Sequence, residues 1–189
     1  MKKLVTICAI LCMAATAAQA VFIVESRDAA GNLTPAPAYA EFGVWANAGA
    51  KSTAEGLIGV GSRYGSTYRS LAGLKEATFT VDLPVAGEYE VFVTWGAGAN
   101  RRANIEHRIV HAGGITAVLV DQRATANEWV SLGTYTFNAG PASVTVSNAW
   151  VDLSGSMYAD AVKWVPEPGA MALLVLGSLG GVVLRRRRA

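Results

Sequence analysis

The chain has 189 residues, enough for one ordinary domain and little more. Its formal net charge of +2 counts six cations at the two termini, whereas residues 21–165 hold ten Lys or Arg and thirteen Asp or Glu, a net charge of −3. A mildly acidic body offers no electrostatic basis for binding nucleic acid. Both cysteines precede residue 21, which excludes disulfides, thiolate metal sites and cysteine nucleophiles from the remaining sequence.

The first 20 residues have the pattern of a secretory signal peptide. Two lysines precede an apolar run over residues 4–18, and an Ala-Gln-Ala site ends at Ala20, directly before Val21. The run is shorter than the roughly 20 residues that a membrane-spanning helix needs, so cleavage is favoured over the alternative of an uncleaved anchor. We therefore expect residues 1–20 to be removed on export, with Ala20 and Val21 flanking the cut.

The body of the chain shows period-two alternation of apolar residues, bounded by Gly, Pro and Asn, and no sustained helical period. This predicts an all-β fold. Trp95 and Trp129 occupy alternation positions that point inward, so we expect both in the core. In chain order, the predicted strands cover residues 21–25, 39–46, 77–83, 88–95, 104–111, 115–121, 129–137, 143–148 and 157–165.

Turn signals separate these strands. A turn at residues 84–87 joins the two clearest strands, and the Gly pair at 113–114 predicts a hairpin. Residues 47–70 are predicted to form a long loop rich in Gly and Ser. Short strands at regular spacing are typical of a two-sheet antiparallel β-sandwich, and a jelly roll is the expected topology.

The C-terminal tail has the physical character of a stop-transfer signal. An uncharged stretch over residues 169–184 is followed by four arginines. At ~1.5 Å per residue it makes a helix of roughly 24 Å, short for a ~30 Å hydrocarbon core but tolerable with local thinning and arginine snorkelling. The positive-inside rule leaves the arginines in the cytoplasm and the domain outside. We therefore expect a transmembrane helix here.

The order of Pro-Glu-Pro, hydrophobic segment and Arg cluster closely resembles the PEP-CTERM sorting signal of Gram-negative bacteria. The resemblance covers residues 166–189 and implies recognition by a membrane transpeptidase of the exosortase type. It also implies a transient inner-membrane anchor and delivery to the cell surface or the extracellular matrix, in hosts that usually make an exopolysaccharide or biofilm matrix. A plain C-terminal anchor is the alternative. The residues of the sorting motif are Pro166, Glu167, Pro168, Arg185, Arg186, Arg187 and Arg188.

Five segments of the body form a further ordered set. They read Pro-Val-Ala-Gly-Glu-Tyr-Glu-Val-Phe-Val-Thr-Trp at 84–95, Asn-Arg at 100–101, Val-His-Ala-Gly-Gly at 110–114, Trp-Val-Ser-Leu-Gly-Thr-Tyr at 129–135 and Ala-Asp-Ala-Val at 159–162. In this order they resemble the golvesin and xanthan lyase C-terminal domain. The resemblance covers roughly residues 22–165 and implies a carbohydrate-binding-like β-sandwich, of the kind attached to many secreted bacterial proteins and enzymes.

A sugar site needs aromatic faces that stack on pyranose rings and polar groups that fix the hydroxyls. Side chains of this kind lie in the predicted loop at 47–70 and directly after the predicted strand at 143–148. Arginines near them can pair with acidic groups of a polysaccharide. A solvated surface with tyrosines packed on loops is the alternative. The candidate residues are Tyr64, Tyr68, Trp150, Arg63, Arg69, Arg101 and Arg102.

Candidate metal ligands are few. Glu25 and Asp160, on the first and last predicted strands, offer oxygens for a structural calcium, but calcium takes six or more, so an Asp that caps a loop is the favoured interpretation. His107 and His111 would lie roughly 13 Å apart on one strand face, too far for a shared zinc ion. We therefore predict no cofactor, and expect His111 to support the Gly turn.

No catalytic constellation is recognisable, since a Gly-x-Ser-x-Gly motif is missing and nothing marks a poised acid–base cleft. We therefore expect a non-catalytic secreted surface or matrix protein that binds an exopolysaccharide or another glycan and is sorted by an exosortase-type system. The alternative is a structural or adhesive surface subunit that engages protein partners or itself, through a sheet edge or the long loop.

Overall fold

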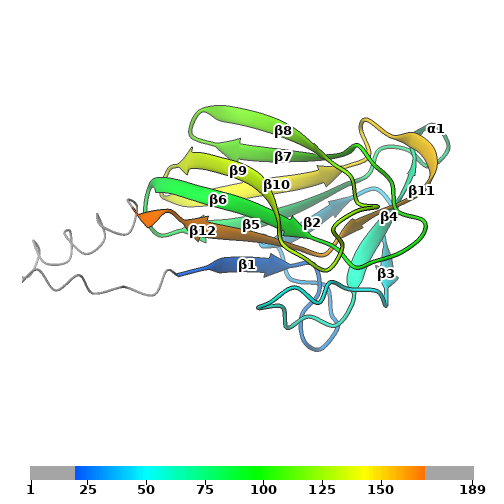
Figure 1. Cartoon of the computed structure of the whole chain (residues 1–189), viewed down its shortest axis with the longest axis horizontal. Coiled ribbons are helices and arrows are strands. Elements are labelled where there is room, and N and C mark those ends of the chain that lie inside the picture. Colours follow the sequence, from blue (N-terminus) through cyan, green and yellow to red (C-terminus); the bar gives the residue numbers. More distant parts are fainter. Residues whose placement is uncertain (1–19, 169–189) are drawn as a thin grey trace, which may run out of the picture.

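The computed structural model describes residues 20–168, in which the chain forms twelve strands and one short helix (Figure 1). The all-β class expected from the sequence is confirmed, and the strands of each sheet pair in antiparallel fashion. The predicted signal segment up to residue 19 and the predicted tail helix lie outside the described residues. Within residues 20–168, no helix is long and apolar enough to cross a membrane.

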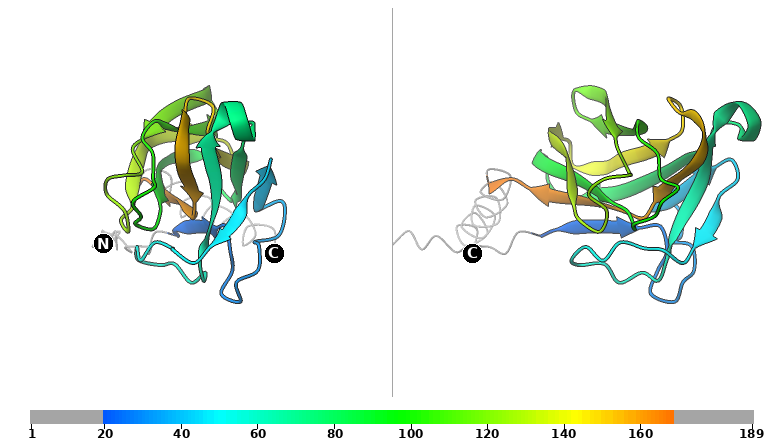
Figure 2. Two further views of the ribbon diagram at one scale, coloured as in Figure 1. Left: turned by 90° about the vertical axis from the view of Figure 1, so that its right-hand side faces the viewer. Right: turned by 45° about the vertical axis from the view of Figure 1, so that its right-hand side comes forward.

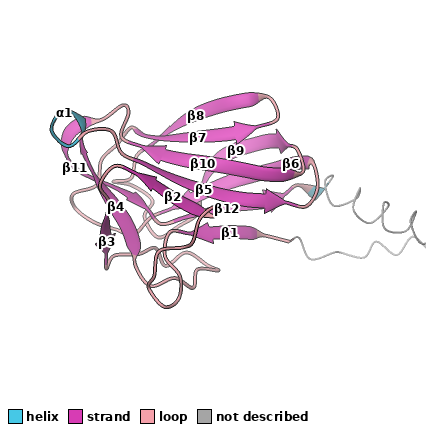
Figure 3. Cartoon of the chain, turned by 180° about the vertical axis from the view of Figure 1, so that it is seen from behind, coloured by secondary structure: helices cyan, strands magenta, loops and turns pink. Residues whose placement is uncertain are grey.

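The strands form three sheets. The four-stranded sheet has the order β1 (Phe22–Glu25), β12 (Ala161–Pro166), β6 (Gly87–Thr94) and β9 (Val130–Phe137). The five-stranded sheet has the order β2 (Tyr39–Phe42), β5 (Glu76–Leu83), β10 (Gly140–Ser147), β7 (Ile105–His111) and β8 (Gly114–Val120). A third sheet has the order β11 (Asp152–Ala159), β4 (Ser62–Tyr68) and β3 (Ala46–Ala48). The helix α1 (Arg69–Ala72) follows β4 at one end of the molecule (Figure 3).

One hydrophobic core is shared by all three sheets. On β5 and β6 the alternate residues point inward as predicted, so that Phe79 and Val91 are fully buried. Trp95 and Trp164 are the largest fully buried side chains, which confirms the core position expected for Trp95. Each large apolar side chain buried in this way contributes about 1.5–3 kcal/mol. The alternation therefore determines which face of each strand packs inward.

The third sheet was not expected. The predicted loop at 47–70 contains β4, whose inward positions carry Gly65 and Thr67 rather than large apolar side chains, so hydrophobic alternation does not reveal it. The strand predicted at 157–165 is in fact two strands, because the chain leaves the third sheet at Asp160 and enters the four-stranded sheet. The strand predicted at 39–46 is likewise divided into β2 and β3. A small sheet thus covers one end of the sandwich.

The core position predicted for Trp129 is wrong. Trp129 is half-buried, and its Nε1 donates to the Glu55 carbonyl (2.9 Å) while the Lys163 ammonium lies 4.4 Å from its ring. The reason is a bulge in β9, where the register against β6 shifts between Gly133 and Ser131. The extra residue, Leu132, turns inward and reverses the alternation that precedes it. Trp129 therefore lies on the outer side of the sheet.

The two ends of the sandwich are different. The described chain enters and leaves at the same end, because Phe22 at the start of β1 pairs with Trp164 near the end of β12. At the opposite end lie α1 and the loop between β10 and β11 (Figures 1 and 2). Both predicted sorting segments therefore attach to one end, and the other end is remote from them.

Candidate functional site

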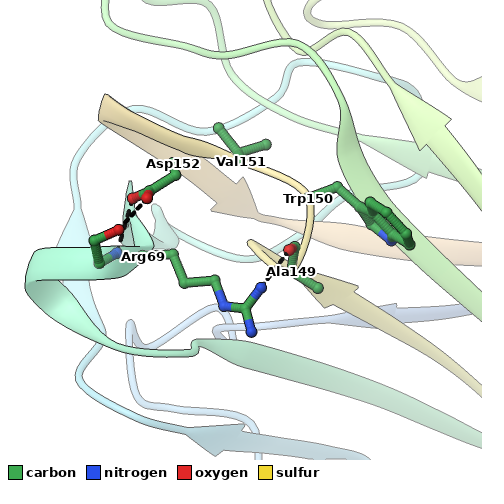
Figure 4. A pocket seen from close by; sticks show the side chains of 6 residues that line it. Arg69, Ala149, Trp150, Val151 and Asp152 are labelled. Carbon is green, nitrogen blue, oxygen red and sulfur yellow. Dashed lines mark hydrogen bonds between the residues drawn. The ribbon is translucent and has the colours of Figure 1, made fainter.

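The end remote from the first and last described residues carries a shallow depression of about 400 Å³ between α1 and the β10–β11 loop. The two segments lie about 80 residues apart in the sequence and are brought together by the pairing of Tyr68 with Asp152 in the third sheet. Figure 4 shows the depression from close by. It is lined by Arg69, Ser70, Ala149, Trp150, Val151 and Asp152.

A buried asparagine holds the two segments in place. Asn148 directly follows β10 and has no exposed surface, and its Nδ2 donates to the carbonyls of Ser66 and Gly73, both at 3.1 Å. Its Oδ1 accepts from the backbone N–H of Lys75 (2.9 Å). One amide thus connects β4, the turn after α1 and the residue directly before β5. Because its donors and acceptor are all used, the loop that carries Trp150 is fixed relative to α1.

One wall of the depression is anionic. The Asp152 carboxylate accepts from the Ser70 backbone N–H (2.8 Å) and from the Ser70 hydroxyl. These hydrogen bonds, above all the one from the hydroxyl, hold the pKa of Asp152 below its usual value. The side chain is therefore ionised at neutral pH, and its remaining lone pairs are open to solvent.

The other wall combines an aromatic ring with a cation. Trp150 is 68% exposed, and its Nε1 donates to Glu106 Oε1 (2.9 Å), which fixes the indole by its edge. The Arg69 Nη1 donates to the Ala149 carbonyl (2.8 Å) (Figure 4). A guanidinium carries five N–H donors, so most of those on the exposed Arg69 face solvent. This arrangement offers a flat apolar face beside donors and an acceptor.

The two candidate tyrosines lie near this site without lining it. Tyr68 directly precedes Arg69 and is partly exposed. Tyr64 is half-buried, stacks on Tyr158 with ring centroids 5.7 Å apart, and lines a separate depression of about 420 Å³ beside Trp45. The structure therefore brings Trp150 and Arg69 together, with Tyr68 next to them, and places Tyr64 elsewhere.

The remaining candidate arginines are used inside the protein. Arg63 forms two hydrogen bonds with Glu41 (2.6 and 2.8 Å). Arg101 is 2% exposed, donates to the carbonyls of Gly96 and Ala97, and stacks on Tyr158 with its guanidinium carbon 3.2 Å from the ring centroid. Arg102 donates to the carbonyls of Arg101 and Ser154. None of the three lines the depression at Trp150.

The two carboxylates considered for calcium each bind the loop at residues 50–60. Glu25 accepts from the backbone N–H groups of Ile58 (2.8 Å) and Gly59 (2.7 Å), and Asp160 accepts from that of Ser52. Burial raises the pKa of Asp160 to about 7, with a further contribution from the nearby Glu25. In the described part of the chain, no three His, Cys, Asp or Glu side chains are grouped as metal ligands would be. The Asp that caps a loop is thus observed.

The two histidines have separate roles. His107 faces the core, where burial lowers its pKa to about 4. His111 lies at the edge of the same strand face, accepts from the backbone N–H of Gly113 (3.2 Å) and stacks on Tyr135 with ring centroids 4.9 Å apart. The expected support of the Gly turn by His111 is confirmed.

Sequence reasoning missed four of the six residues that line the depression. Ser70, Ala149 and Val151 carry no chemical signal of their own, and Asp152 is one of thirteen acids in the body of the chain. The available signal was Asn148 at a strand end, because a buried side chain with four hydrogen-bonding groups commonly organises a loop. Without the position of β4, its partners could not be named.

Two family models and a related enzyme match this chain. The model of the golvesin C-terminal domain matches residues 33–166, and that of the PEP-CTERM protein-sorting motif matches residues 165–188. A xanthan lyase of Bacillus sp. (strain GL1) is 38% identical over 149 residues, which cover 76% of this chain and 14% of the enzyme. The match thus spans about one seventh of that relative.

The solved structure of a relative shares this fold. The structure of a Paenibacillus xanthan lyase has a TM-score of 0.63 and 29% identity, over 79% of this chain and 13% of the enzyme. A CBM35 domain from Cellvibrio japonicus has a TM-score of 0.45 and 15% identity, over 77% of this chain and 93% of the module. The chain belongs to the golvesin C-terminal domain family and carries a PEP-CTERM protein-sorting motif after that domain.

Proposed function

We propose that this protein is a non-catalytic exported protein of the cell surface or extracellular matrix, which binds polysaccharide at the depression around Trp150. The observation that carries the proposal is the 68% exposed Trp150 ring, which lines the same depression as the Arg69 guanidinium and the Asp152 carboxylate. A pyranose presents an apolar face to an aromatic ring and hydroxyls to charged groups at the rim. Arg69 also suits the carboxylates of acidic sugars.

The position of the site supports this role. The sorting motif follows β12 at one end of the domain, and α1, which lines the depression, lies at the opposite end. A chain anchored through its tail would direct Trp150 away from the membrane. The xanthan lyase relative pairs a domain of this family with an enzyme that acts on a polysaccharide. In this proposal an exosortase-type transpeptidase processes the tail, and the inner membrane holds it only transiently.

Affinity electrophoresis of the full chain in gels that contain xanthan or a neutral glucan tests the proposal. We expect retardation in at least one polymer, and Trp150→Ala should weaken it by about fivefold or more, because stacking on an aromatic ring contributes on the order of 1 kcal/mol or more. The matched control is Trp129→Ala, which removes a half-buried tryptophan on another face. Equal retardation of the wild type and Trp150→Ala, or none in any polymer, would refute the site.

A further inference from the structure

The five-stranded sheet ends in an unprotected strand. β8 is the last strand of that sheet and pairs only with β7 among the described strands. It reads Gly-Ile-Thr-Ala-Val-Leu-Val and contains no charge and no proline. Natural sheets usually protect their edges with charges, proline, bulges or short strands. β8 has none of these devices.

The other edge strands of the described sheets do have them. β1, β2 and β3 have four residues or fewer. β9 is interrupted by its bulge. β11 has a register shift against β4, and its Ser156 forms a bridge with Arg101. Among the described strands, β8 is therefore the long and regular edge strand, and this indicates that it pairs with a strand of another molecule.

The backbone of β8 presents three residues outward. Strand β8 follows a two-residue turn closed by the pair of His111 with Gly114, so the even-numbered residues of β8 exchange hydrogen bonds with β7. The chain continues in this phase, since the Gln122 backbone N–H donates to the Arg102 carbonyl (3.0 Å). The N–H and C=O groups of the odd-numbered residues therefore point away from the sheet. These residues are Ile115, Ala117 and Leu119.

The same three residues also carry exposed side chains. Ile115 is 68% exposed and Leu119 is 51% exposed, and both lie on the outer face of the sheet, where Val110 of β7 is exposed beside them. The outward backbone groups and the outward apolar side chains thus belong to the same positions. An added strand would form hydrogen bonds with these backbone groups and would cover part of these side chains.

We propose that β8 pairs with β8 of a second copy of this chain, antiparallel and centred on Ala117. This register sets Ala117 opposite Ala117 and Ile115 opposite Leu119 across a two-fold axis, and it makes a continuous ten-stranded sheet. The chemistry of the strand is symmetric about Ala117, with Thr116 and Val118 on one face and the two large aliphatic side chains on the other. No charge meets a like charge, and this self-complementarity favours a second copy over a different partner.

The geometry has a consequence for assembly. Pairing through one strand buries less than the ~1,200 Å² of a stable interface, so the contact is reversible and depends on concentration. A two-fold axis perpendicular to the sheet points the chain termini of the two copies in opposite directions. The pairing therefore suits released copies, or copies on facing surfaces, rather than neighbours anchored in one membrane. It does not depend on the sugar site.

Cysteine cross-linking of the full chain tests the register, with the two leader cysteines changed to serine. A short bis-maleimide should join Ala117→Cys to itself, whereas Ala40→Cys, on the opposite edge strand of the same sheet, should give no dimer. Ile115→Cys should fail with itself, since the two copies of residue 115 lie roughly 13 Å apart, and should cross-link when mixed with Leu119→Cys. Equal yields at positions 117 and 40, or self-linking at 115, would overturn the proposal.

A second measurement follows the equilibrium without cross-links. In sedimentation equilibrium of the full chain in detergent, the wild type should dimerise with rising concentration. Ala117→Lys places two ammonium groups opposite each other and should weaken the dimer about fivefold, while Ala40→Lys and Trp150→Ala should leave it unchanged. A wild type that is monomeric at all concentrations, or an Ala117→Lys variant that dimerises equally well with an unchanged circular dichroism spectrum, would exclude the pairing.

Discussion

Two regions of the molecule combine an arginine with an aromatic ring, and they differ in burial and in hydrogen bonding. At the depression, Arg69 and Trp150 are exposed, and each spends one hydrogen bond on the protein. Near Asp160, Arg101 is buried, donates to two carbonyls and lies flat on Tyr158. The first region leaves its aromatic face and most of its donors exposed to solvent, whereas the second uses them to hold the chain together.

The difference shows that residue type alone does not identify a sugar site. Both arginines were candidates for the same role, because an arginine can pair with the acidic groups of a polysaccharide. What separates them is the bridge between Arg101 and Ser156, which places Arg101 against the edge of the third sheet. Burial then decides that Arg101 stabilises the fold and that Arg69 faces solvent.

Alanine substitution at the two arginines should give the largest contrast. Arg101→Ala leaves the carbonyls of Gly96 and Ala97 without their donors and removes the stack on Tyr158, so we expect a loss of about 3 kcal/mol in the free energy of unfolding. Arg69→Ala should cost less than about 0.5 kcal/mol, as for most exposed side chains. Urea denaturation of the two variants measures both values. Similar losses for the two would remove the distinction between the regions.

The carboxylates of the two regions should differ in their pH dependence. Burial raises the pKa of Asp160 to about 7. Between pH 5 and pH 7 the Asp160 carboxyl group is therefore ionised in the unfolded state, whereas in the folded state it loses its proton only as the pH approaches 7. The stability that Asp160 contributes therefore falls as the pH rises through this window, by about 2 kcal/mol. Asp160→Asn should gain that amount relative to the wild type between pH 5 and pH 7, while keeping an oxygen for the Ser52 N–H.

Two comparisons complete this experiment. Burial lowers the pKa of His107 to about 4. The contribution of His107 to the free energy of unfolding therefore rises as the pH rises from 4 to 6.5, opposite to that of Asp160. For this reason the wild type should be nearly flat, and the difference between variant and wild type is the informative quantity. Asp152→Asn is the matched control, because the lowered pKa of Asp152 leaves it ionised in both states above pH 5. A flat difference for Asp160→Asn would contradict the burial of this carboxylate.

Most strands of the sandwich could be predicted from the sequence, whereas only part of the candidate site could. Strands such as β5 and β6 bury one apolar face, so alternation reveals them. β4 buries glycine and hydroxyl residues, and the bulge at Leu132 reverses the phase before it, so neither the third sheet nor the position of Trp129 could be found by alternation. Trp150 was identified because it follows a strand end, but its neighbours Ser70 and Asp152 depend on a sheet that alternation does not show.

The indole N–H resonances of the five tryptophans give the most direct test of the central claim. In a titration of the isotope-labelled full chain with oligosaccharides prepared from the polymer that retards it, the Trp150 resonance should move and saturate. Those of the buried Trp95 and Trp164 should remain in place. Movement of the Trp129 resonance alone, or saturable binding with no change at Trp150, would contradict the assignment of the site.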